Sequence, residues 1–297
     1  MAKLRLVLTD KCNFNCMFCH SDQVCSKHDS CLNASDYGFL VKTAKDIGID
    51  HVVLTGGEPL SRADINEIIE ELYKCGIHLK ITTNGSLINK IEKPQYINGL
   101  NISLHSTDLI SHKKITGQNF ALPSIIENIE RIKNYNNINK KINVVALKTL
   151  TISQQNLKAL LNFCVNYNSD LKIIELLDNQ NSEFIEIGKI KEQLYSMGFK
   201  VTYEIGRNVY LSNTRTRVIL QKCFCQFAKD KNKPGKLCHQ QNDLFILPSG
   251  KISCCRLKTD FIDILQDIKN RNKDELQKKL SLALNILGEE CPFEKKQ

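Results

Sequence analysis

Three cysteines at CxxxCxxC spacing constrain this chain more than any other feature. Cys12, Cys16 and Cys19 directly follow an apolar run from Leu4 to Leu8 that reads as a strand. Thiolates select iron–sulfur clusters, zinc or copper, and a closed zinc site or a fully protein-ligated [4Fe-4S] cluster takes four protein ligands. The triplet therefore predicts a cluster with one iron left open for another ligand. The plainer alternative is a zinc knuckle or three unrelated core cysteines.

Cysteine usage and hydropathy indicate the compartment. The chain has 13 cysteines in 297 residues and begins without a recognisable signal peptide, which favours metal or redox chemistry in a reducing cytosol over a disulfide scaffold. A hydrophobic content of 42% predicts one large core, or a core with a small annex. No apolar run approaches the ~20 residues that a membrane span needs. We expect a cytoplasmic protein without membrane contact.

The formal net charge is +9, which raises the question of an anionic partner. The lysines are scattered over Lys/Asn-rich segments, and no basic stripe with interleaved aromatic residues is present. Nucleic-acid binding is therefore not expected. The charge indicates either a solvated basic surface or attraction to an anionic substrate or an acidic electron donor.

Strand-like and helix-like segments alternate through the first two thirds of the chain. The strands expected after the first are 51–55, 79–83, 100–104, 142–147 and 171–177, and the helices are 40–47, 61–75, 124–135, 153–167 and 187–197. This alternation predicts a parallel sheet with right-handed crossovers. Six such units are too few for an eight-stranded barrel but fit a partial (β/α)6 barrel. The loops that follow the strands then gather at one face.

The pattern changes near Lys200. Short strand-like pieces are expected at 201–205, 209–211, 218–221 and 244–247, followed by a helical stretch over roughly 264–287. We place a domain boundary near residue 205. Residues 1–205 form the α/β partial barrel, and residues 206–297 form a small cysteine-rich α+β domain.

The tetrapeptide Gly56-Gly57-Glu58-Pro59 follows the strand at 51–55. Glycines let a backbone approach a ligand closely, and Glu58 can balance charge nearby, although such a sequence also suits a tight turn before a capped helix. Together with the cysteine triplet, this turn resembles the radical S-adenosylmethionine (radical SAM) superfamily. In that family the open iron binds S-adenosylmethionine, whose reductive cleavage gives a 5'-deoxyadenosyl radical that abstracts hydrogen from a substrate.

A series of motifs narrows the resemblance. They are Leu4-Arg5-Leu6, Leu54 to Leu60, Thr82-Thr83-Asn84-Gly85, Asn101 to Leu104, Ile115-Thr116-Gly117 and Ile173 to Leu176. In this order they are similar to the branch typified by the GTP 3',8-cyclase of molybdenum-cofactor synthesis, over about residues 3 to 260. The resemblance implies a partial TIM barrel in which Cys12, Cys16 and Cys19 hold the cleaving cluster. It also implies an S-adenosylmethionine site at Phe18, Gly56, Gly57, Glu58, Ser103 and Leu177, and substrate contacts at Arg5, Thr82 and Lys141.

Several positions depart from that cyclase. Val53 stands where the cyclase has an arginine before its Leu-Thr-Gly-Gly-Glu motif, and the stretch from Cys238 to Leu244 lacks the cyclase's arginine pair. The C-terminal Gly-Gly is missing as well. Arginine gives bidentate contacts to phosphate and base edges that lysine does not replace. The departures argue against GTP and leave a polar, nucleotide- or sugar-like small molecule as the expected substrate.

The spacing of the C-terminal cysteines resembles that of a second domain found in this superfamily. Cys238, Gly250 and Cys255 have the spacing of the hairpin that opens a SPASM/twitch domain, which implies an auxiliary [4Fe-4S] cluster. We expect Cys225, Cys238, Cys255 and Cys291 as its ligands, with Cys223 and Cys254 as further candidates. A zinc ribbon or reduced core thiols are the alternative. If Cys255 is a ligand, Cys254 points the other way along the strand, either to give a hydrogen atom to a substrate radical, as in radical SAM epimerases, or to pack in the core.

The expected protein is therefore a radical SAM enzyme of cyclase, epimerase or oxidoreductase type, reduced by a donor such as flavodoxin or ferredoxin. GTP 3',8-cyclase itself is one alternative. A peptide-modifying enzyme (epimerase or crosslinking) is another, disfavoured because no leader-binding domain fits before residue 3. A non-enzymatic metal or redox module would need neither Gly56 to Pro59 nor the six strand–helix units.

Overall fold

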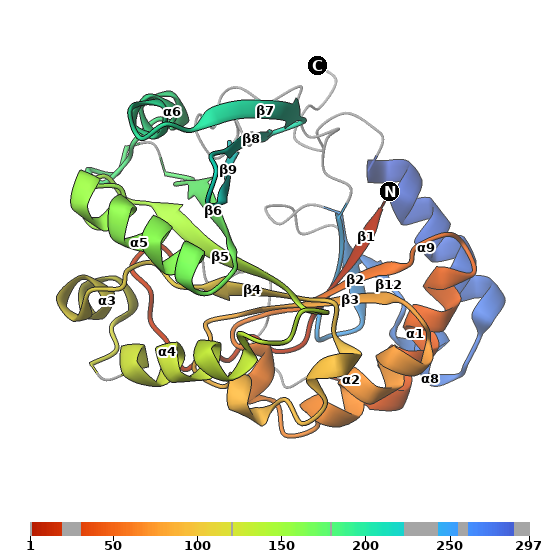
Figure 1. Ribbon diagram of the computed structural model, residues 1–297. Helices are drawn as coiled ribbons and strands as arrows, with labels where there is room; N and C mark the ends of the chain where they lie inside the picture. The colour runs from red at the N-terminus through yellow and green to blue at the C-terminus, as the bar shows by residue number, and fades with distance from the viewer. Residues whose placement is uncertain are drawn as a thin grey trace, which may run out of the picture.

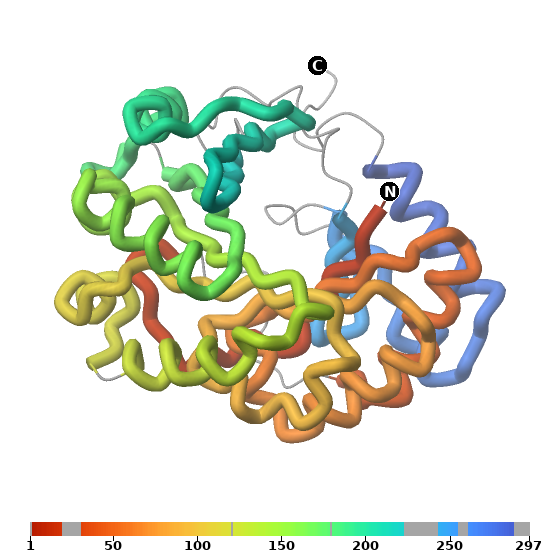
Figure 2. The backbone as a smooth tube through the Cα atoms, in the orientation of Figure 1, coloured from red at the N-terminus to blue at the C-terminus, as the bar shows by residue number. Residues whose placement is uncertain are grey.

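The computed structural model describes residues 2–19, 31–119, 121–178, 180–222, 243–254 and 261–287. In these residues one 12-stranded sheet curves around the middle of the molecule, and the helices lie on its outer side (Figure 1). The strand order is β12-β11-β10-β1-β2-β3-β4-β5-β6-β9-β8-β7. The backbone trace in Figure 2 follows the same curve from the red first strand to the green hairpin that begins with β7.

Six parallel strands in chain order form the centre of this sheet. They are β1 (Lys3–Val7), β2 (His51–Thr55), β3 (His78–Thr83), β4 (Gly99–Ser103), β5 (Asn139–Ala146) and β6 (Asp170–Glu175). The α-helices between and after them are α1 (Ala34–Lys45), α2 (Ile65–Lys74), α3 (Leu109–Thr116), α4 (Ala121–Ile132), α5 (Gln154–Asn166) and α6 (Ile187–Ser196). Short 3-10 helices cover Pro59–Ser61, Ile88–Lys90 and Pro94–Tyr96. The partial (β/α)6 barrel expected from the sequence is confirmed.

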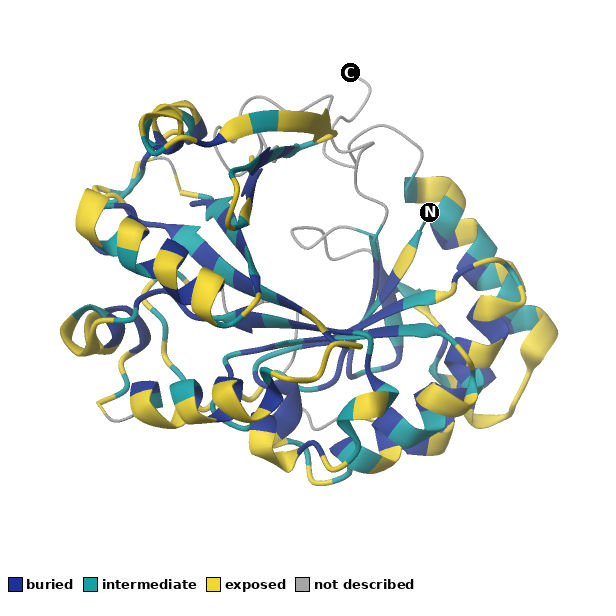
Figure 3. Cartoon of the chain, viewed as in Figure 1, coloured by how far each residue is buried: buried dark blue, intermediate teal, exposed yellow. Residues whose placement is uncertain are grey.

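Alternation along each strand separates the two faces of the sheet. Leu4, Leu6 and Leu8 belong to the main core between sheet and helices, whereas Arg5 points to the inner face. Figure 3 shows the same separation, with buried residues between the sheet and the helices and exposed residues on the outer helix surfaces. The outer face supplies the packing, and the inner face is left for polar side chains.

Residues after 199 return to both ends of this sheet. The antiparallel strands β7 (Lys200–Ile205), β8 (Asn208–Ser212) and β9 (Arg217–Gln221) extend it beyond β6, to which β9 is parallel. Strands β10 (Asp243–Ile246), β11 (Lys251–Ser253) and β12 (Ile262–Asp263) extend it beyond β1. The domain boundary near residue 205 stays a prediction.

Several expected helices differ in their ends: α2 begins at Ile65 rather than at residue 61, and α4 spans Ala121–Ile132 rather than 124–135. Helix α1 begins at Ala34 rather than at Leu40, because Asn33 caps it and Asp36 completes a capping box. The stretch 264–287 is divided into α8 (Leu265–Lys269) and α9 (Lys273–Leu287), since Arg271 adopts a left-handed conformation with φ of 55°. Helix α3 was not expected from the sequence. None of the described helices is long and apolar enough to cross a bilayer.

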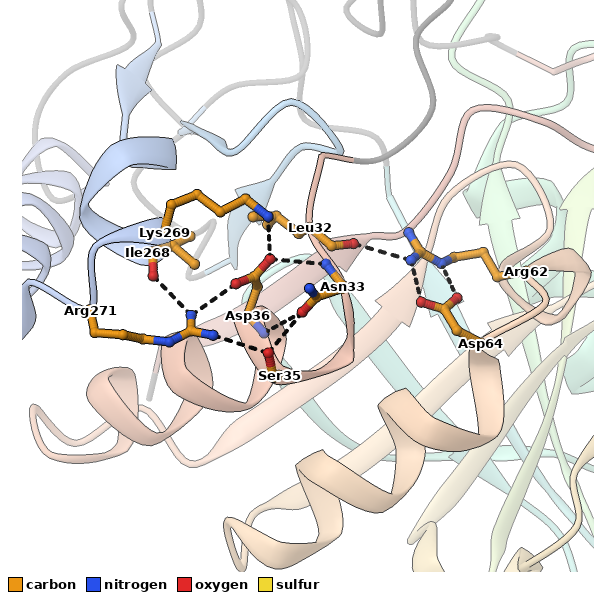
Figure 4. Close-up of polar contacts among 9 residues, drawn as sticks. All are labelled: Leu32, Asn33, Ser35, Asp36, Arg62, Asp64, Ile268, Lys269 and Arg271. Atoms are coloured by element: carbon orange, nitrogen blue, oxygen red, sulfur yellow. Dashed lines mark hydrogen bonds and ion pairs between the residues drawn. The ribbon is translucent and has the colours of Figure 1, made fainter.

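Asp36 links the start of α1 to the C-terminal helices. Its carboxylate, almost fully buried, accepts hydrogen bonds from Lys269 and from Arg271 (2.9 Å), and its backbone N–H donates to the Asn33 side chain (Figure 4). Burial pushes the pKa of Asp36 upward, but these partners outweigh it and hold the pKa below its ordinary value of 3.8. The two ion pairs of Asp36 therefore hold the C-terminal helices against the barrel.

We expect Asp36→Asn to lower the free energy of unfolding by about 2 kcal/mol at pH 7, since it leaves two cations beside a neutral amide. The effect is measured by urea denaturation of the metal-free chain. Because the folded-state pKa is lowered, this stabilisation is present above pH 3.8 and is lost as the pH falls through the folded-state value. The control is Asp46→Asn, which removes an exposed pair with Lys273 and changes stability little. Equal loss in both variants would contradict the role given to Asp36.

Candidate functional site

The turn after β2 is locked onto the backbone that leads to the first cysteine. Gly57 N–H donates to Thr9 O (2.8 Å), and Glu58 N–H donates to Lys11 O (2.9 Å). A Cβ on Gly56 would lie 2.3 Å from Thr9 O, and one on Gly57 would lie 2.2 Å from Lys11 O. Any other residue would push the two backbones apart, so this contact explains both glycines.

Helix α3 holds the same loop from the other side. Asn15 N–H donates to Thr116 O (3.0 Å), and Met17 N–H donates to Ile115 O (2.9 Å). Phe18 packs edge-on against His105, with ring centroids 4.6 Å apart. The cysteine loop therefore lies between two structural elements that do not themselves carry the cysteines.

The three thiols fit a cationic iron–sulfur cluster. Cys12 and Cys19 are exposed and Cys16 is half-buried. Burial, together with the neighbouring Cys19 and Cys12 thiolates, raises the pKa of Cys16 to about 12, and burial also raises the pKa of Cys12. Three thiolates repel one another here, and bound metal offsets that repulsion. Within the described ranges no three His, Cys, Asp or Glu side chains converge as closely as a single metal ion requires.

The Glu58 side chain is turned into the protein, and its role at the cofactor stays a prediction. Its fully buried carboxylate accepts hydrogen bonds from Leu60 N–H (3.0 Å), Thr83 Oγ1 (2.8 Å) and Asn84 N–H (2.7 Å). Burial raises its pKa although these hydrogen bonds oppose the shift. Glu58 thus joins the glycine turn to the end of β3, and its oxygens are occupied by protein donors.

The remaining expected cofactor residues lie near the carboxyl ends of the strands. Ser103 ends β4, and Leu177 follows β6 by two residues. Asn143 on β5 pairs with Ser103 in register, and its buried Oδ1 has no hydrogen-bond partner among the described residues. A buried acceptor without a donor is costly unless a ligand supplies one, so Asn143 is a further candidate for this site.

The expected substrate residues share the inner face of the sheet. Thr82, Asn101 and Lys141 are aligned across β3, β4 and β5, and Asn101 donates to Thr82 Oγ1 (3.2 Å). Arg5 Nε donates to Asp243 Oδ2 on β10 (2.7 Å). The structure therefore brings Arg5, Thr82 and Lys141 to one side of the sheet.

Further cations join them, which the sequence analysis missed. The positive charges of Lys141, Arg5 and Arg207 help to lower the pKa of Lys172 on β6. The charges of Lys80 and Lys3 act in the same direction on the pKa of Lys141. We call these six side chains the inner cation group: Lys3, Arg5, Lys80, Lys141, Lys172 and Arg207. Burial and the neighbouring cations lower the pKa of Lys172 to about 7, and burial lowers those of Lys141 and Lys80. Polar residues at alternate positions of central parallel strands were the available signal, because such strands are usually apolar on both faces.

The structure places Cys254 away from these residues. It follows β11 directly, packs against the main core and donates to Ala283 O of α9 (Sγ to O, 3.6 Å). This is the helix side of the sheet, which agrees with core packing, one of the two roles expected for Cys254; the role in hydrogen transfer stays a prediction. The expected auxiliary ligands Cys225, Cys238, Cys255 and Cys291, and also Cys223, lie outside the described residues.

Comparison with known proteins identifies the family. The radical SAM superfamily model matches residues 6–161, more than half of the 297 residues. A probable GTP 3',8-cyclase of Pyrobaculum aerophilum is 29% identical over 291 residues, covering 96% of this chain and 93% of the relative. Another, from Sulfurisphaera tokodaii, is 32% identical and covers 94% of this chain and 88% of the relative. The chain belongs to the radical SAM superfamily and is a radical SAM enzyme.

Solved structures agree on the fold. Streptococcus suis SuiB bound to S-adenosylmethionine superimposes with a TM-score of 0.64 at 18% identity; the match covers 89% of this chain but only 61% of SuiB. A structure of anSMEcpe with bound AdoMet superimposes with a TM-score of 0.63 at 14% identity, covering 97% of this chain and 84% of that one. Family membership implies a [4Fe-4S] cluster and S-adenosylmethionine as cofactors.

The Glu58 contacts lead to a stability prediction. Glu58→Ala leaves two buried donors and one partly buried donor without an acceptor, so we expect the free energy of unfolding of the metal-free chain to fall by about 3 kcal/mol. Chemical denaturation measures the change. Glu127→Ala on the exposed face of α4 is the matched control and should have almost no effect. A Glu58 variant as stable as this control would show that the carboxylate does not brace the turn.

For Lys172 we predict that a substitution raises the free energy of unfolding instead of lowering it. We expect Lys172→Met to raise the free energy of unfolding at pH 7 by about 3 kcal/mol, because it removes a desolvated cation among other cations. The Lys172 contribution to stability should rise by about 1.4 kcal/mol per pH unit between pH 7 and 9, since the folded chain releases the lysine proton there and the unfolded chain keeps it. Lys172→Met should lose this slope, and Lys158→Met on the outer surface should keep it. Urea titrations at pH 7, 8 and 9 test both points; a destabilised Lys172→Met with an unchanged slope would refute them.

Proposed function

We propose that this enzyme cleaves S-adenosylmethionine reductively and abstracts hydrogen from an anionic small molecule of nucleotide or sugar type. One observation carries the proposal. The sheet whose strands β1 and β2 lead into the cysteine loop and the Gly56-Gly57 turn also presents the inner cation group. Lys3 and Arg5 lie on β1, and Lys141 and Lys172 lie on the neighbouring strands β5 and β6. Cofactor and substrate residues thus share one sheet, as in β/α barrels generally.

Cys12, Cys16 and Cys19 are the proposed ligands of the cleaving cluster. When bound, the cluster and S-adenosylmethionine supply the electron and the 5'-deoxyadenosyl radical that begin the reaction. The glycine turn keeps the loop backbone in register, and Phe18, Ser103, Leu177 and Asn143 are proposed to line the cofactor. Flavodoxin or ferredoxin is the proposed type of electron donor.

The inner cation group is proposed to hold the anionic part of the substrate. Lys141 and Lys172 lose their like-charge repulsion when an anion lies between them. The pKa of Lys172, about 7 without a ligand, then rises. The enzyme therefore takes up a proton when it binds the anion at neutral pH. Asp243 accepts from Arg5 and fixes the direction of its guanidinium.

GTP 3',8-cyclase activity is the second candidate, because the curated relatives described above carry that name. Val53 replaces the arginine of the cyclase, but Val53 pairs in register with both Arg5 and Lys80. Lys80 therefore brings a positive charge to the strand beside the missing arginine. This relocation keeps a phosphate-bearing substrate possible without the bidentate contact.

An auxiliary [4Fe-4S] cluster at Cys225, Cys238, Cys255 and Cys291 remains part of the proposal. The antiparallel pair β10–β11 supports it, because a hairpin of paired strands is what the resemblance to a SPASM/twitch domain implies at this point of the chain. A peptide-modifying activity has no described contact in its favour.

The proposed function is tested by anaerobic turnover. The reconstituted enzyme is given dithionite and S-adenosylmethionine, alone or with GTP, guanosine or a sugar phosphate, and 5'-deoxyadenosine is measured. We expect phosphorylated compounds to stimulate product formation at least tenfold and guanosine to do so weakly. Lys141→Met should raise the half-saturating concentration of the phosphorylated compound at least tenfold, because it removes a cation from the proposed anion site.

Two controls separate the parts of this proposal. Lys158→Met should behave as wild type, and Cys16→Ala should give no 5'-deoxyadenosine. No product from the wild type under any condition would reject radical chemistry. Equal stimulation by guanosine and GTP would reject the anionic substrate but leave the radical chemistry in place.

A further inference from the structure

Arg62 contacts both ends of the segment that carries the three cysteines. Its Nη1 donates to Leu8 O (3.0 Å), just beyond β1, and its Nη2 donates to Leu32 O (3.1 Å), just before α1 (Figure 4). Leu8 and Leu32 are far apart in the chain but are joined here by one guanidinium. Cys12, Cys16 and Cys19 all lie between them.

The guanidinium is held in direction by its neighbours. Asp64 accepts from both Nε (2.8 Å) and Nη2 (2.7 Å) of Arg62, a bidentate arrangement. The guanidinium carbon also lies 5.7 Å from the centre of the Tyr37 ring. The Arg62 side chain is 14% exposed, so its hydrogen bonds are largely shielded from water.

Arg62 also belongs to the segment that follows the glycine turn. Its own N–H donates to Pro59 O (3.3 Å), at the end of the 3-10 helix that Glu58 caps. Gly57 and Glu58 contact the start of the cysteine loop, and Arg62 contacts its start and its end. One short stretch of chain thus fixes the cysteine loop at both ends and forms the turn beside it.

We propose that Arg62 is a positioning residue that joins the ends of the cysteine loop and thereby pre-organises it for the cluster. Holding both ends lowers the conformational entropy that the loop must lose when three thiolates bind one cluster. A lysine reaches one carbonyl at a time and cannot keep the bidentate contact with Asp64. The inference rests on the proposed cluster site at Cys12, Cys16 and Cys19.

The first test uses the metal-free chain. Amide hydrogen exchange is compared in wild type, Arg62→Ala, Arg62→Lys and Asp64→Asn, with Arg131→Ala on the exposed face of α4 as the control. We expect at least fivefold faster exchange in residues 8–19 and 31–36 of Arg62→Ala, a smaller change in Asp64→Asn, and none in Arg131→Ala. Unchanged exchange in these residues, or an equal increase in all strands, would overturn the proposal.

The second test uses the reconstituted protein. Iron loss to an excess of chelator should be at least threefold faster in Arg62→Ala and Arg62→Lys than in wild type. Added guanidinium at millimolar concentration should slow the loss in Arg62→Ala, whereas methylammonium should not. Iron loss at the wild-type rate in Arg62→Ala would overturn the role of Arg62.

The two tests distinguish a failure of this inference from a failure of the proposed function on which it rests. If the wild type binds no iron–sulfur cluster but Arg62→Ala still exchanges faster in residues 8–19, the proposed cluster fails and the joining of the loop ends stands. If the wild type binds its cluster and Arg62→Ala retains iron equally well, the inference fails and the proposed function stands.

Discussion

The backbone contact between the Gly56-Gly57 turn and the stretch from Thr9 to Lys11 is the constraint on which the site depends. Two N–H to carbonyl hydrogen bonds and the absence of two Cβ atoms bring these backbones together. The contact requires β1 and β2 to be adjacent and parallel, because only then do both loops leave the same edge of the sheet. Pairing of the strands therefore determines where the three thiols and the glycine turn meet.

The two faces of the sheet meet opposite physical requirements. The outer face carries the leucines and isoleucines that pack against the helices and provide the hydrophobic stabilisation. The inner face carries lysines whose pKa values are lowered by burial and by one another. Charges in this arrangement oppose folding, so their presence is better explained by a ligand than by stability. Packing against the helices accounts for the outer face, and the proposed anionic substrate would account for the cations of the inner face.

Sequence patterns predicted the parallel strands and the position of the cysteine loop beside the glycine turn. Both follow from local periodicity and from the rule that loops after parallel strands share a face. The burial of the Glu58 carboxylate was not predictable, because it depends on donors from Thr83, the last residue of β3, and from Asn84, which follows it. The inner cation group was missed for a similar reason: Lys80, Lys141 and Lys172 are far apart in sequence and are gathered only by the curvature of the sheet. The return of β9 and β10 to opposite ends of the sheet also depends on long-range pairing.

The most direct test of the account is electron paramagnetic resonance of the dithionite-reduced protein, with iron and sulfide counted on the same samples. The wild type is compared with a variant in which Cys12, Cys16 and Cys19 are all alanine. The account predicts that the wild-type signal changes when S-adenosylmethionine is added, and that the variant loses about four irons together with this change. A variant that keeps all its iron and a signal sensitive to S-adenosylmethionine, or a wild type that binds zinc instead of iron, would contradict it.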